Sequence, residues 1–541
     1  MKPLGEMQDW PLRVMRLVDH AEREHGAREI VTAWAGGRIT RTNWRGVIHD
    51  ARRMAQALEA AGIKPGDRVA TLAMNHSGHL TAWYGAIGMG GVLHTINPRL
   101  FDDQILFIAN HAEDRVLIYD HVFAATVERL KPRIETIEKY VCFDSEVDDA
   151  DSLAAWLAPH DGDYQWVEGD ELDPCALCYT SGTTGNPKGV LYSHRSTLLH
   201  AMAEVAPDSF NLSTKSCVMP IVPMFHANAW GIPWAAPLTG CKLVLSADYR
   251  PAQLCDLYRD EEVTHSAGVP TVWLGMIEHI ERTGAGLSDL KYVTIGGSAA
   301  PRAMIEWFRA RGIHVMHAWG MTETSPIGSI GGMPANWDGM SDEEQVAFTI
   351  HQGRIPFGVE LRIIDEDGTV LPRDGVHSGN LQIRGPWVIR RYFKESSDAA
   401  AADGWFDTGD VAALHPGGTM QITDRSKDVI KSGGEWISSI ELENAAIGCP
   451  GVAEAAAIGI AHPKWDERPL LVVVRRAGSD VTPDAIRAHL ATQVARWWLP
   501  DAIEFVDELP HTATGKLSKK TLREQFRDYR FAGAEAMVGR D

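Results

Sequence analysis

The most informative stretch of the chain reads Tyr179-Thr-Ser-Gly-Thr-Thr-Gly-Asn-Pro-Lys-Gly-Val190. It follows an apolar stretch at 175–178, which reads as a strand, and it precedes a helical stretch at 196–205. Between Ser181 and Gly189 lie three hydroxyl side chains, three glycines and one lysine. Small residues let backbone N–H groups converge on phosphate oxygens, hydroxyls donate further hydrogen bonds, and a lysine neutralises charge. The stretch therefore predicts a phosphate-binding loop.

The spacing within this loop differs from that of the nucleotide-binding P-loop. That motif places four residues between its first glycine and Gly-Lys-Ser/Thr. Here two residues separate Gly185 from Lys188, and Gly189 follows the lysine. An ordinary glycine turn is the alternative interpretation, and the ordered run of hydroxyls, glycines, proline and lysine argues against it.

The sequence around this loop alternates between strand-like and helix-like segments. Strands are expected at 68–74, 115–120, 291–297 and 314–319, and helices at 77–91 and 301–311, with Pro301 in the first helical turn. This alternation predicts an α/β fold of wound layers with mainly parallel sheets.

The pattern changes after about residue 424. Strands are expected at 453–460, 470–475 and 503–506, with a helix at 483–497, which together describe a compact α+β unit. The polar run Asp424-Arg-Ser-Lys-Asp428 is the expected linker. We therefore expect two domains, at 1–424 and 425–541.

The composition is that of an acidic globular protein. Hydrophobic residues make up 45% of the 541 residues and charged residues 23%, and 52 basic against 72 acidic residues leave a net charge of −20. These values exclude a disordered or fibrous chain and a uniformly basic face for nucleic acid. The apolar runs are far shorter than the roughly 20 residues of a membrane-spanning helix, and no secretory signal is visible. We therefore expect a cytoplasmic protein.

The seven cysteines do not form a disulfide framework. Cys175 and Cys178 have the spacing of a metal or redox pair, but no second Cys/His pair with ligand spacing lies near them. We therefore expect both to be buried structural cysteines.

Seven motifs along the chain together resemble one enzyme superfamily. The phosphate loop is followed by Met224-Phe-His226, Gly296-Gly-Ser-Ala-Ala-Pro301, Trp319-Gly-Met-Thr-Glu323, Trp405-Phe-Asp-Thr-Gly-Asp410, Asp424-Arg425 and Thr514-Gly-Lys516. In this order they resemble the adenylate-forming superfamily of acyl-CoA synthetases, luciferases and peptide-synthetase adenylation domains. The resemblance covers nearly the whole chain. It implies a large N-terminal adenylate-forming domain of wound sheets and a small, mobile α+β C-terminal domain.

Within that superfamily, three phrases resemble the medium- and long-chain fatty acyl-CoA synthetases. They are Met224-Phe-His-Ala-Asn-Ala-Trp-Gly231, Lys431-Ser-Gly-Gly-Glu-Trp-Ile-Ser-Ser439 and His462-Pro-Lys-Trp-Asp-Glu-Arg-Pro469. The resemblance implies a fatty acid–CoA ligase that uses ATP, Mg²⁺ and coenzyme A and forms acyl-CoA, AMP and pyrophosphate through an acyl-AMP intermediate. It also implies a homodimer. Methylmercaptopropionate-CoA ligases share much of this wording, so that acid, or an aryl or cinnamate-type acid, is the alternative substrate.

The resemblance also implies where ATP and its metal would bind. The β- and γ-phosphates would be held by Thr180, Ser181, Gly182, Thr183, Thr184, Gly185 and Lys188. Thr184 and Glu323 would supply the hard oxygen ligands that Mg²⁺ prefers. Adenine would bind between a wall of Gly297, Ser298 and Ala299 and a wall of His317, Ala318 and Trp319, with Thr322 in the same nucleotide site. Relatives usually carry a tyrosine in place of Trp319, so the hydrogen bond of a tyrosine hydroxyl is expected to be lost while stacking is kept.

The remaining roles concern the ribose, the catalytic lysines and the acid. Asp410 would accept hydrogen bonds from both ribose hydroxyls, beside Arg425. Lys516 would act in adenylation, Lys431 would support thioester formation, Lys427 would lie at the interdomain hinge, and Trp436 would cover the adenine. In the acid site, Trp230 would gate an acyl tunnel whose mouth is also lined by His226 and Ala227.

Two other functions are compatible with the superfamily. One is an adenylating enzyme with a different acceptor, such as a carrier protein or oxygen. The other is a non-catalytic nucleotide binder, which we would expect to have lost Lys516 or Glu323, whereas both are present.

Overall fold

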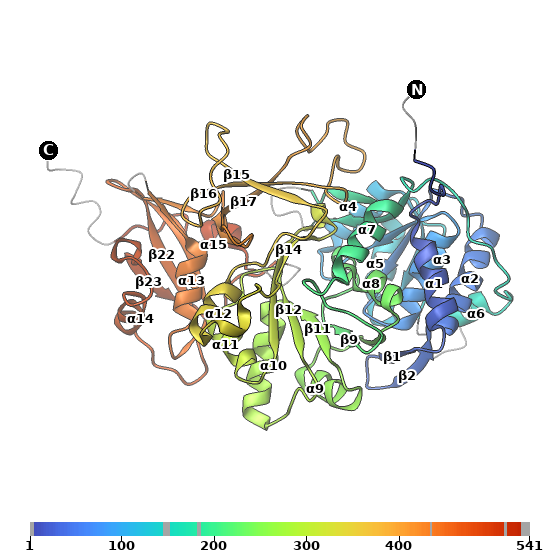
Figure 1. Cartoon of the computed structure of the whole chain (residues 1–541), viewed down its shortest axis with the longest axis horizontal. Helices are drawn as coiled ribbons and strands as arrows, with labels where there is room; N and C mark the ends of the chain where they lie inside the picture. The colour runs from blue at the N-terminus through green and yellow to red at the C-terminus, as the bar shows by residue number, and fades with distance from the viewer. Residues whose placement is uncertain (1–4, 144–151, 181–185, 433–434, 513–516, 532–541) are drawn as a thin grey trace.

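The computed structural model describes residues 5–143, 152–180, 186–432, 435–512 and 517–531. Its strands form four sheets, and most of its helices cover the two largest (Figure 1). The predicted architecture of a large α/β part followed by a small α+β unit is confirmed.

A six-stranded sheet lies in the N-terminal part, with strand order β6-β5-β3-β4-β7-β8. Its strands are β3 (Arg68–Leu72), β4 (Val92–Thr95), β5 (Asp114–Tyr119), β6 (Lys139–Cys142), β7 (Pro174–Tyr179) and β8 (Gly189–Ser193). All neighbours pair in parallel except β7 and β8, which flank the phosphate loop as an antiparallel pair. The sequence did not lead us to predict β8, although Val190-Leu-Tyr192 is β-prone. The helix expected at 196–205 is present as α7 (His194–Glu204).

The second sheet has eight strands in the order β14-β13-β12-β11-β9-β10-β1-β2. They are β1 (Glu29–Ala33), β2 (Ile39–Asn43), β9 (Cys217–Pro220), β10 (Lys242–Ser246), β11 (His265–Gly268), β12 (Tyr292–Ile295), β13 (His314–Gly320) and β14 (Ile327–Ile330). The central pairs are parallel, as the alternating pattern predicts, and antiparallel pairs close the two edges. The carboxyl ends of β12 and β13 therefore meet at one edge, where ligands bind in folds of this kind.

Twelve helices of the large part surround these sheets in the described ranges. They are α1 (Val14–His25), α2 (Trp44–Ala60), α3 (Ser77–Gly88), α4 (Asp102–Ala112), α5 (Ala124–Leu130), α6 (Leu153–Leu157), α7 (His194–Glu204), α8 (Ile232–Thr239), α9 (Pro251–Asp260), α10 (Pro270–Thr283), α11 (Arg302–Arg309) and α12 (Asp342–Ile350). Pro301 is the N-cap of α11 and not part of its first turn. Of the helices in the described residues, none is long and apolar enough to cross a bilayer.

The third sheet connects the large part to the C-terminal unit. It is antiparallel, in the order β15 (Glu360–Ile364), β16 (Ser378–Arg384), β17 (Phe406–Leu414) and β18 (Met420–Arg425). The first two residues of the expected linker 424–428 belong to β18, where Asp424 is buried and pairs with β17.

Among its described residues, the C-terminal unit contains the fourth sheet and three α-helices. Its strands are β19 (Ile430–Ser432), β20 (Glu435–Ile437), β21 (Val452–His462), β22 (Asp466–Arg475) and β23 (Ala502–Phe505), and its helices are α13 (Ser439–Ile447), α14 (Pro483–Leu490) and α15 (Lys519–Gln525). The predicted helix 483–497 is too long. The chain leaves the helical conformation, because Ala495 has an extended ψ of 140°, before a short 3₁₀ turn at Arg496–Trp498.

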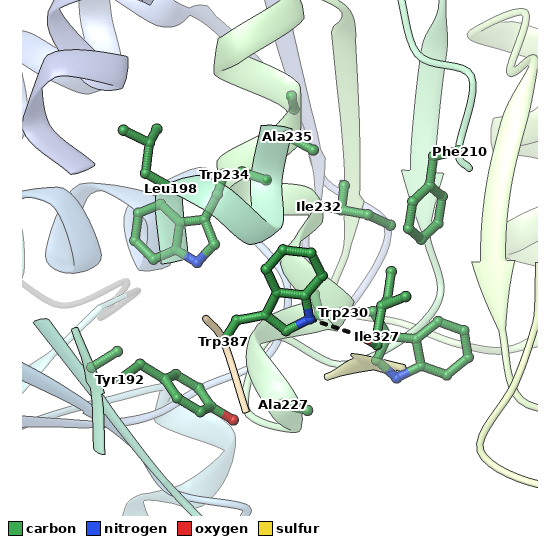
Figure 2. Packing of buried hydrophobic residues seen from close by; sticks show 14 of the residues in the cluster. Tyr192, Leu198, Phe210, Ala227, Trp230, Ile232, Trp234, Ala235, Ile327 and Trp387 are labelled. Carbon is green, nitrogen blue, oxygen red and sulfur yellow. Dashed lines mark hydrogen bonds between the residues drawn. The ribbon is translucent and has the colours of Figure 1, made fainter. Parts of the chain in front are cut away.

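The largest apolar cluster lies between the six- and eight-stranded sheets. It joins α1, α2, α7 and α8 to strands of both sheets and includes Trp230, Trp234 and Trp387. Figure 2 shows these three indoles with Phe210 and Ile327 grouped around the segment that carries Trp230. Trp230 and Ala227, two of the residues predicted to line an acyl site, therefore lie inside the large part of the molecule.

Candidate active site

The two ends of the phosphate-loop segment are tied to each other. The N–H of Thr180 donates to the carbonyl of Lys188 at 2.9 Å, and the N–H of Lys188 donates to Thr180 Oγ1 at 3.1 Å. The Lys188 ammonium lies 4.7 Å from the centroid of the Tyr392 ring. The other predicted phosphate ligands, Ser181, Gly182, Thr183, Thr184 and Gly185, lie outside the described residues.

Glu323 is brought next to this segment. It lies in a 3₁₀ turn, Thr322–Thr324, where it is only 7% exposed, and the Tyr392 hydroxyl donates to its Oε1 at 2.8 Å. Burial raises the pKa of the Glu323 carboxyl, whereas Tyr392, Arg425 and Lys188 act in the opposite direction. The fold therefore gathers two cations around the predicted metal ligand.

The predicted Mg²⁺ site can be judged by whether Glu323 and its surroundings offer ligands that Mg²⁺ prefers. The described residues contain no group of three or more His, Cys, Asp or Glu side chains that could hold a metal ion. Mg²⁺ in nucleotide sites is typically bound by one or two carboxylates together with phosphate oxygens and water. A buried carboxylate held by Tyr392 fits that donor set. Thr184, the second predicted ligand, lies outside the described residues.

Asp410 is held from two sides. The Trp319 indole N–H donates to its Oδ2 at 2.9 Å, and Arg425 Nε lies 3.0 Å from its Oδ1. Asp410 and Arg425 are also directly opposite each other in the β17–β18 pair. Because a carboxylate offers about four acceptor sites, this arrangement fixes its orientation and leaves capacity for further donors. Relatives usually carry a tyrosine at the position of Trp319. Here the indole N–H supplies a polar contact, with Asp410, where a tyrosine would offer its hydroxyl.

His317 connects the two predicted adenine walls. The N–H of Ala300 donates to its Nε2 at 3.1 Å, and its Nδ1 faces the carbonyl of Ile350 at 2.9 Å. Burial lowers the pKa of His317 to about 4, so the ring is neutral and carries its proton on Nδ1. Gly297, Ser298 and Ala299 lie in the loop after β12, and Ala318 follows His317 on the neighbouring strand β13. The predicted walls do lie side by side.

Gly296 lies between residues predicted to bind the acid and residues predicted to bind the nucleotide. A Cβ atom at Gly296 would lie 3.0 Å from the carbonyl oxygen of Ala318 and 3.2 Å from Cη2 of Trp230. These contacts are tight, so a larger residue at this position would require its neighbours to shift by a few tenths of an ångström. The Trp230 ring therefore packs closely against the loop that carries one of the predicted adenine walls.

Trp230 itself lies in an unusual turn. Residues Ala227–Trp230 all have φ between 43° and 56°, and Gly231 follows with φ 87°. Left-handed backbone costs about 1–2 kcal/mol for each non-glycine residue, so neighbouring structure must impose it. The Cys178 thiol lies 3.2 Å from Oδ1 of Asn228 in this turn. His226 precedes the turn and is partly buried.

The segment before the turn is anchored by Asn75, which lies just after a strand of the six-stranded sheet. Asn75 follows β3, donates from Nδ2 to the carbonyl of Val222 at 2.9 Å and accepts the N–H of Met224 at Oδ1 at 2.7 Å. Sequence reasoning missed both Asn75 and Tyr392. Neither stands in a local pattern, and each reaches its partners only through the fold.

The cysteine pair is placed as expected. Cys175 and Cys178 are buried in β7, and burial raises the pKa of the two thiols to about 12 and about 11. Such thiols are unreactive near neutral pH, which supports the structural interpretation.

The small unit presents the remaining predicted residues. Lys427 and Lys431 are exposed, and the N–H of Lys431 donates to Glu467 Oε2 at 3.0 Å. Trp436 pairs with Lys431 through the β19–β20 backbone, and Lys516 lies outside the described residues. The contacts of Lys431, Trp436 and Lys516 with a nucleotide therefore stay predictions.

The junction to this unit is held by a buried polar cluster. The Asp424 carboxylate accepts the N–H of Ser439 at 2.6 Å, and the Lys519 ammonium lies 2.8 Å from Glu443 Oε1. Burial raises the pKa of Glu443 to about 7. These contacts connect the end of β18 to the start of α13 and to α15.

Two sequence profiles match the chain over most of its length. "AMP-binding enzyme" matches residues 17–393, and "AMP-binding enzyme C-terminal domain" matches residues 441–516. The chain belongs to the AMP-binding enzyme family. The predicted membership of the adenylate-forming superfamily is thereby confirmed.

Several relatives of this AMP-binding enzyme are CoA ligases. It is 46% identical to a 3-methylmercaptopropionyl-CoA ligase of Ruegeria lacuscaerulensis, over 97% of this chain and 99% of the relative. It is 45% identical to a medium-chain-fatty-acid–CoA ligase of Ectopseudomonas oleovorans, over 97% and 98% of the two chains. It is 43% identical to a long-chain-fatty-acid–CoA ligase of Thermus thermophilus, over 98% of both. The enzyme is an AMP-forming acyl-CoA synthetase, as the sequence predicted.

The fold comparison agrees. A crystal structure of the anthranilate CoA ligase AuaEII in complex with anthranoyl-AMP superposes with a TM-score of 0.85, at 23% identity, and covers 96% of this chain and 99% of that one. At this identity the likeness shows the fold alone.

Proposed function

We propose that this synthetase is an ATP-dependent fatty acid–CoA ligase for medium- to long-chain acids, working through an acyl-AMP intermediate. The observation that carries the proposal is the packing of Trp230 against Gly296, between the nucleotide loop and an apolar cluster. An alkyl chain bound beside Trp230 would be surrounded by apolar side chains, while its carboxylate would face the nucleotide. Both reactants are anions, so positioning and charge neutralisation are the main catalytic tasks.

The residues of the nucleotide side divide these tasks. Thr180, Lys188 and the loop between them would bind the β- and γ-phosphates. Glu323, with Thr184, would hold Mg²⁺, which neutralises phosphate charge when bound. Asp410 would accept from the ribose hydroxyls in the orientation that Trp319 and Arg425 impose on it.

Replacing Trp319 with phenylalanine tests the Asp410 assignment. The phenyl ring keeps an aromatic wall, but Asp410 loses one of its two fixing contacts. A single hydrogen bond contributes about 1 kcal/mol, so we expect KM for ATP to rise about fivefold at little change in kcat. Trp307→Phe is the matched control, because the Trp307 indole also donates to a carboxylate, Glu281, but does so on the surface of α11. An unchanged KM in Trp319→Phe would contradict the proposed ribose site.

The small unit would supply the second set of groups. Lys516 would act during adenylation and Lys431 during thioester formation, with Lys427 at the hinge of a domain rotation between the two half-reactions. The domain boundary that we propose lies between residues 424 and 425, which are the last two residues of β18. A homodimer and a cytoplasmic location complete the proposal.

A second acid is favoured by the comparisons. The relatives of highest identity among those described are named for 3-methylmercaptopropionate, a short thioether acid, and not for a fatty acid. That acid, or an aryl acid, is the alternative substrate of the same ligase reaction.

One assay separates these functions. Pyrophosphate release is measured with straight-chain acids of four to sixteen carbons, 3-methylmercaptopropionate and cinnamate, each with and without CoA. The proposal predicts turnover of fatty acids that depends on CoA. A sharp preference for the thioether or aryl acid would change the substrate that we propose but not the ligase reaction. Turnover that does not depend on CoA would point to another acceptor.

Trp230→Ala tests the acid side of the site. Each buried methylene contributes about 0.8 kcal/mol, so kcat/KM should rise about fourfold per carbon until the site ends. Removing the ring should move that cut-off while KM for ATP stays unchanged, and Trp230→Phe should restore most of the wild-type profile. An unchanged profile in a folded Trp230→Ala protein would make Trp230 a packing residue only.

A further inference from the structure

A buried carboxyl group lies directly behind the turn that carries Trp230. Glu204, the last residue of α7, has a side chain only 1% exposed, and within the described residues neither of its oxygens has a hydrogen-bond partner. Its carboxyl fills the space beside Gly231. A Cβ atom at Gly231 would lie 2.3 Å from Glu204 Oε2 and 2.6 Å from its Cδ. The proposed chemistry of the nucleotide and of the carboxylate does not use this residue.

The polar neighbour of Glu204 is His200, one helical turn earlier. His200 Nδ1 lies 3.5 Å from Glu204 Oε2, which is too long for a good hydrogen bond. The N–H of Ile327 donates to His200 Nε2 at 3.1 Å, so this ring nitrogen is engaged by the backbone and only Nδ1 faces Glu204. Burial raises the pKa of the Glu204 carboxyl, whereas His200 acts in the opposite direction.

The surroundings of this pair are the apolar cluster proposed to bind the acyl chain. The His200 ring meets the Trp387 ring edge-on at 5.8 Å, and the Trp387 indole donates to the carbonyl of Ile327 at 2.9 Å. In Figure 2, Trp387 and Ile327 lie beside Trp230, with Phe210 and Ile232 close by. Glu204 also accepts the N–H of Phe210 at its main-chain carbonyl, at 2.9 Å. The carboxyl group is thus part of the wall of that cluster.

A buried carboxyl whose polar neighbour is a histidine nitrogen at 3.5 Å destabilises the fold, since a hydrophobic residue of similar size would avoid the cost of desolvation. Positions that break the packing rules in this way are characteristic of functional sites. An alkyl chain that reached the space beside Gly231 would have to displace the Glu204 side chain, and a methylene group offers a carboxyl no hydrogen bond in return.

We propose that Glu204 is a specificity-determining residue that closes the far end of the acyl site, so that, within the proposed range, the enzyme takes medium-chain acids and rejects long-chain ones. This inference rests on the proposed function, because it requires the acid to bind beside Trp230. It narrows the substrate class to chains that end before the carboxyl of Glu204.

The test compares Glu204→Ala and Glu204→Gln with the wild-type enzyme. kcat/KM for pyrophosphate release is measured with straight-chain acids of four to sixteen carbons and with ω-methylthio acids of increasing length. In Glu204→Ala the cut-off should move to longer acids, with about a fourfold gain for each methylene that the enlarged site buries. Glu204→Gln keeps the size and polarity of the side chain and should keep the wild-type cut-off. Met202→Ala, at an exposed position of the same helix, is the matched control and should behave like the wild type.

Folding of Glu204→Ala is checked by a single cooperative melting transition and a wild-type KM for ATP. The inference would be overturned if folded Glu204→Ala and the wild type had the same chain-length cut-off in kcat/KM. This holds for whichever acid series the wild type accepts. Wild-type turnover of the methylthio series alone would instead refute the fatty-acid function, and a cut-off that moves within that series would still support the role of Glu204.

Discussion

Lys516→Ala is expected to abolish most of the acyl-AMP formation and to leave the second half-reaction intact. The carboxylate and the α-phosphate repel each other as they approach, and the proposed role of Lys516 is to neutralise both in the transition state. Loss of one preorganised electrostatic contact of this kind costs about two to three orders of magnitude in rate. Acyl-AMP supplied from outside should still be converted to acyl-CoA at close to the wild-type rate, because Lys431 and not Lys516 is proposed to act in that step.

The two half-reactions are measured separately, by pyrophosphate release without CoA and by acyl-CoA formation from acyl-AMP. Lys520→Ala is the matched control, since Lys520 is an exposed lysine at the start of α15. Its neighbour Lys519 is unsuitable because it is buried against Glu443 and Ser439. Equal loss of both half-reactions in Lys516→Ala would contradict the assignment of separate lysines and the domain rotation that separates them.

The fold could be predicted from the sequence to a large extent because its signals are local. The strand at 68–74 and the helix at 77–91 match β3 and α3 to within three residues, since apolar runs and helical periodicity are read within one element. The errors lie where local propensity competes with the fold. Asp424 looks like a linker residue by its charge, but Ser439 and the strand β17 hold it inside the structure.

The site could be predicted only where its residues belong to ordered motifs. Glu323, Asp410 and Trp319 were predicted as site residues in this way, whereas the contact between Trp319 and Asp410 spans 91 positions and has no sequence signal. Tyr392 reaches Glu323 across 69 positions, and Asn75 reaches Met224 across 149. Hydrogen bonds of such range depend on how the sheets pack, which periodicity does not describe.

The left-handed turn at Ala227–Trp230 shows the same limit from the backbone. Its residues include only one asparagine and no glycine before Gly231, so the composition does not indicate positive φ. Contacts with other segments, such as that of the Cys178 thiol with Asn228, accompany the turn. The position of Trp230 against Gly296 follows from this turn, and it could not have been derived from an apolar stretch alone.

Glu323→Gln is expected to reduce adenylation by about two orders of magnitude or more, because it keeps the shape of the side chain and removes a charge next to the phosphates. The Tyr392 hydroxyl can still donate to the amide oxygen, so the variant tests the charge and not the hydrogen bond. Glu366→Gln, at an exposed carboxylate, is the control.

The pH dependence gives a second readout. Because burial raises the pKa of Glu323, its charge is present above that pKa and is lost at a higher pH than for an ordinary glutamate as the solution is acidified. The apparent KM for Mg²⁺ of the wild type should therefore rise as the pH falls, and Glu323→Gln should lose this dependence. Near-wild-type adenylation by Glu323→Gln at saturating Mg²⁺, with the pH dependence intact, would show that Glu323 does not bind the metal.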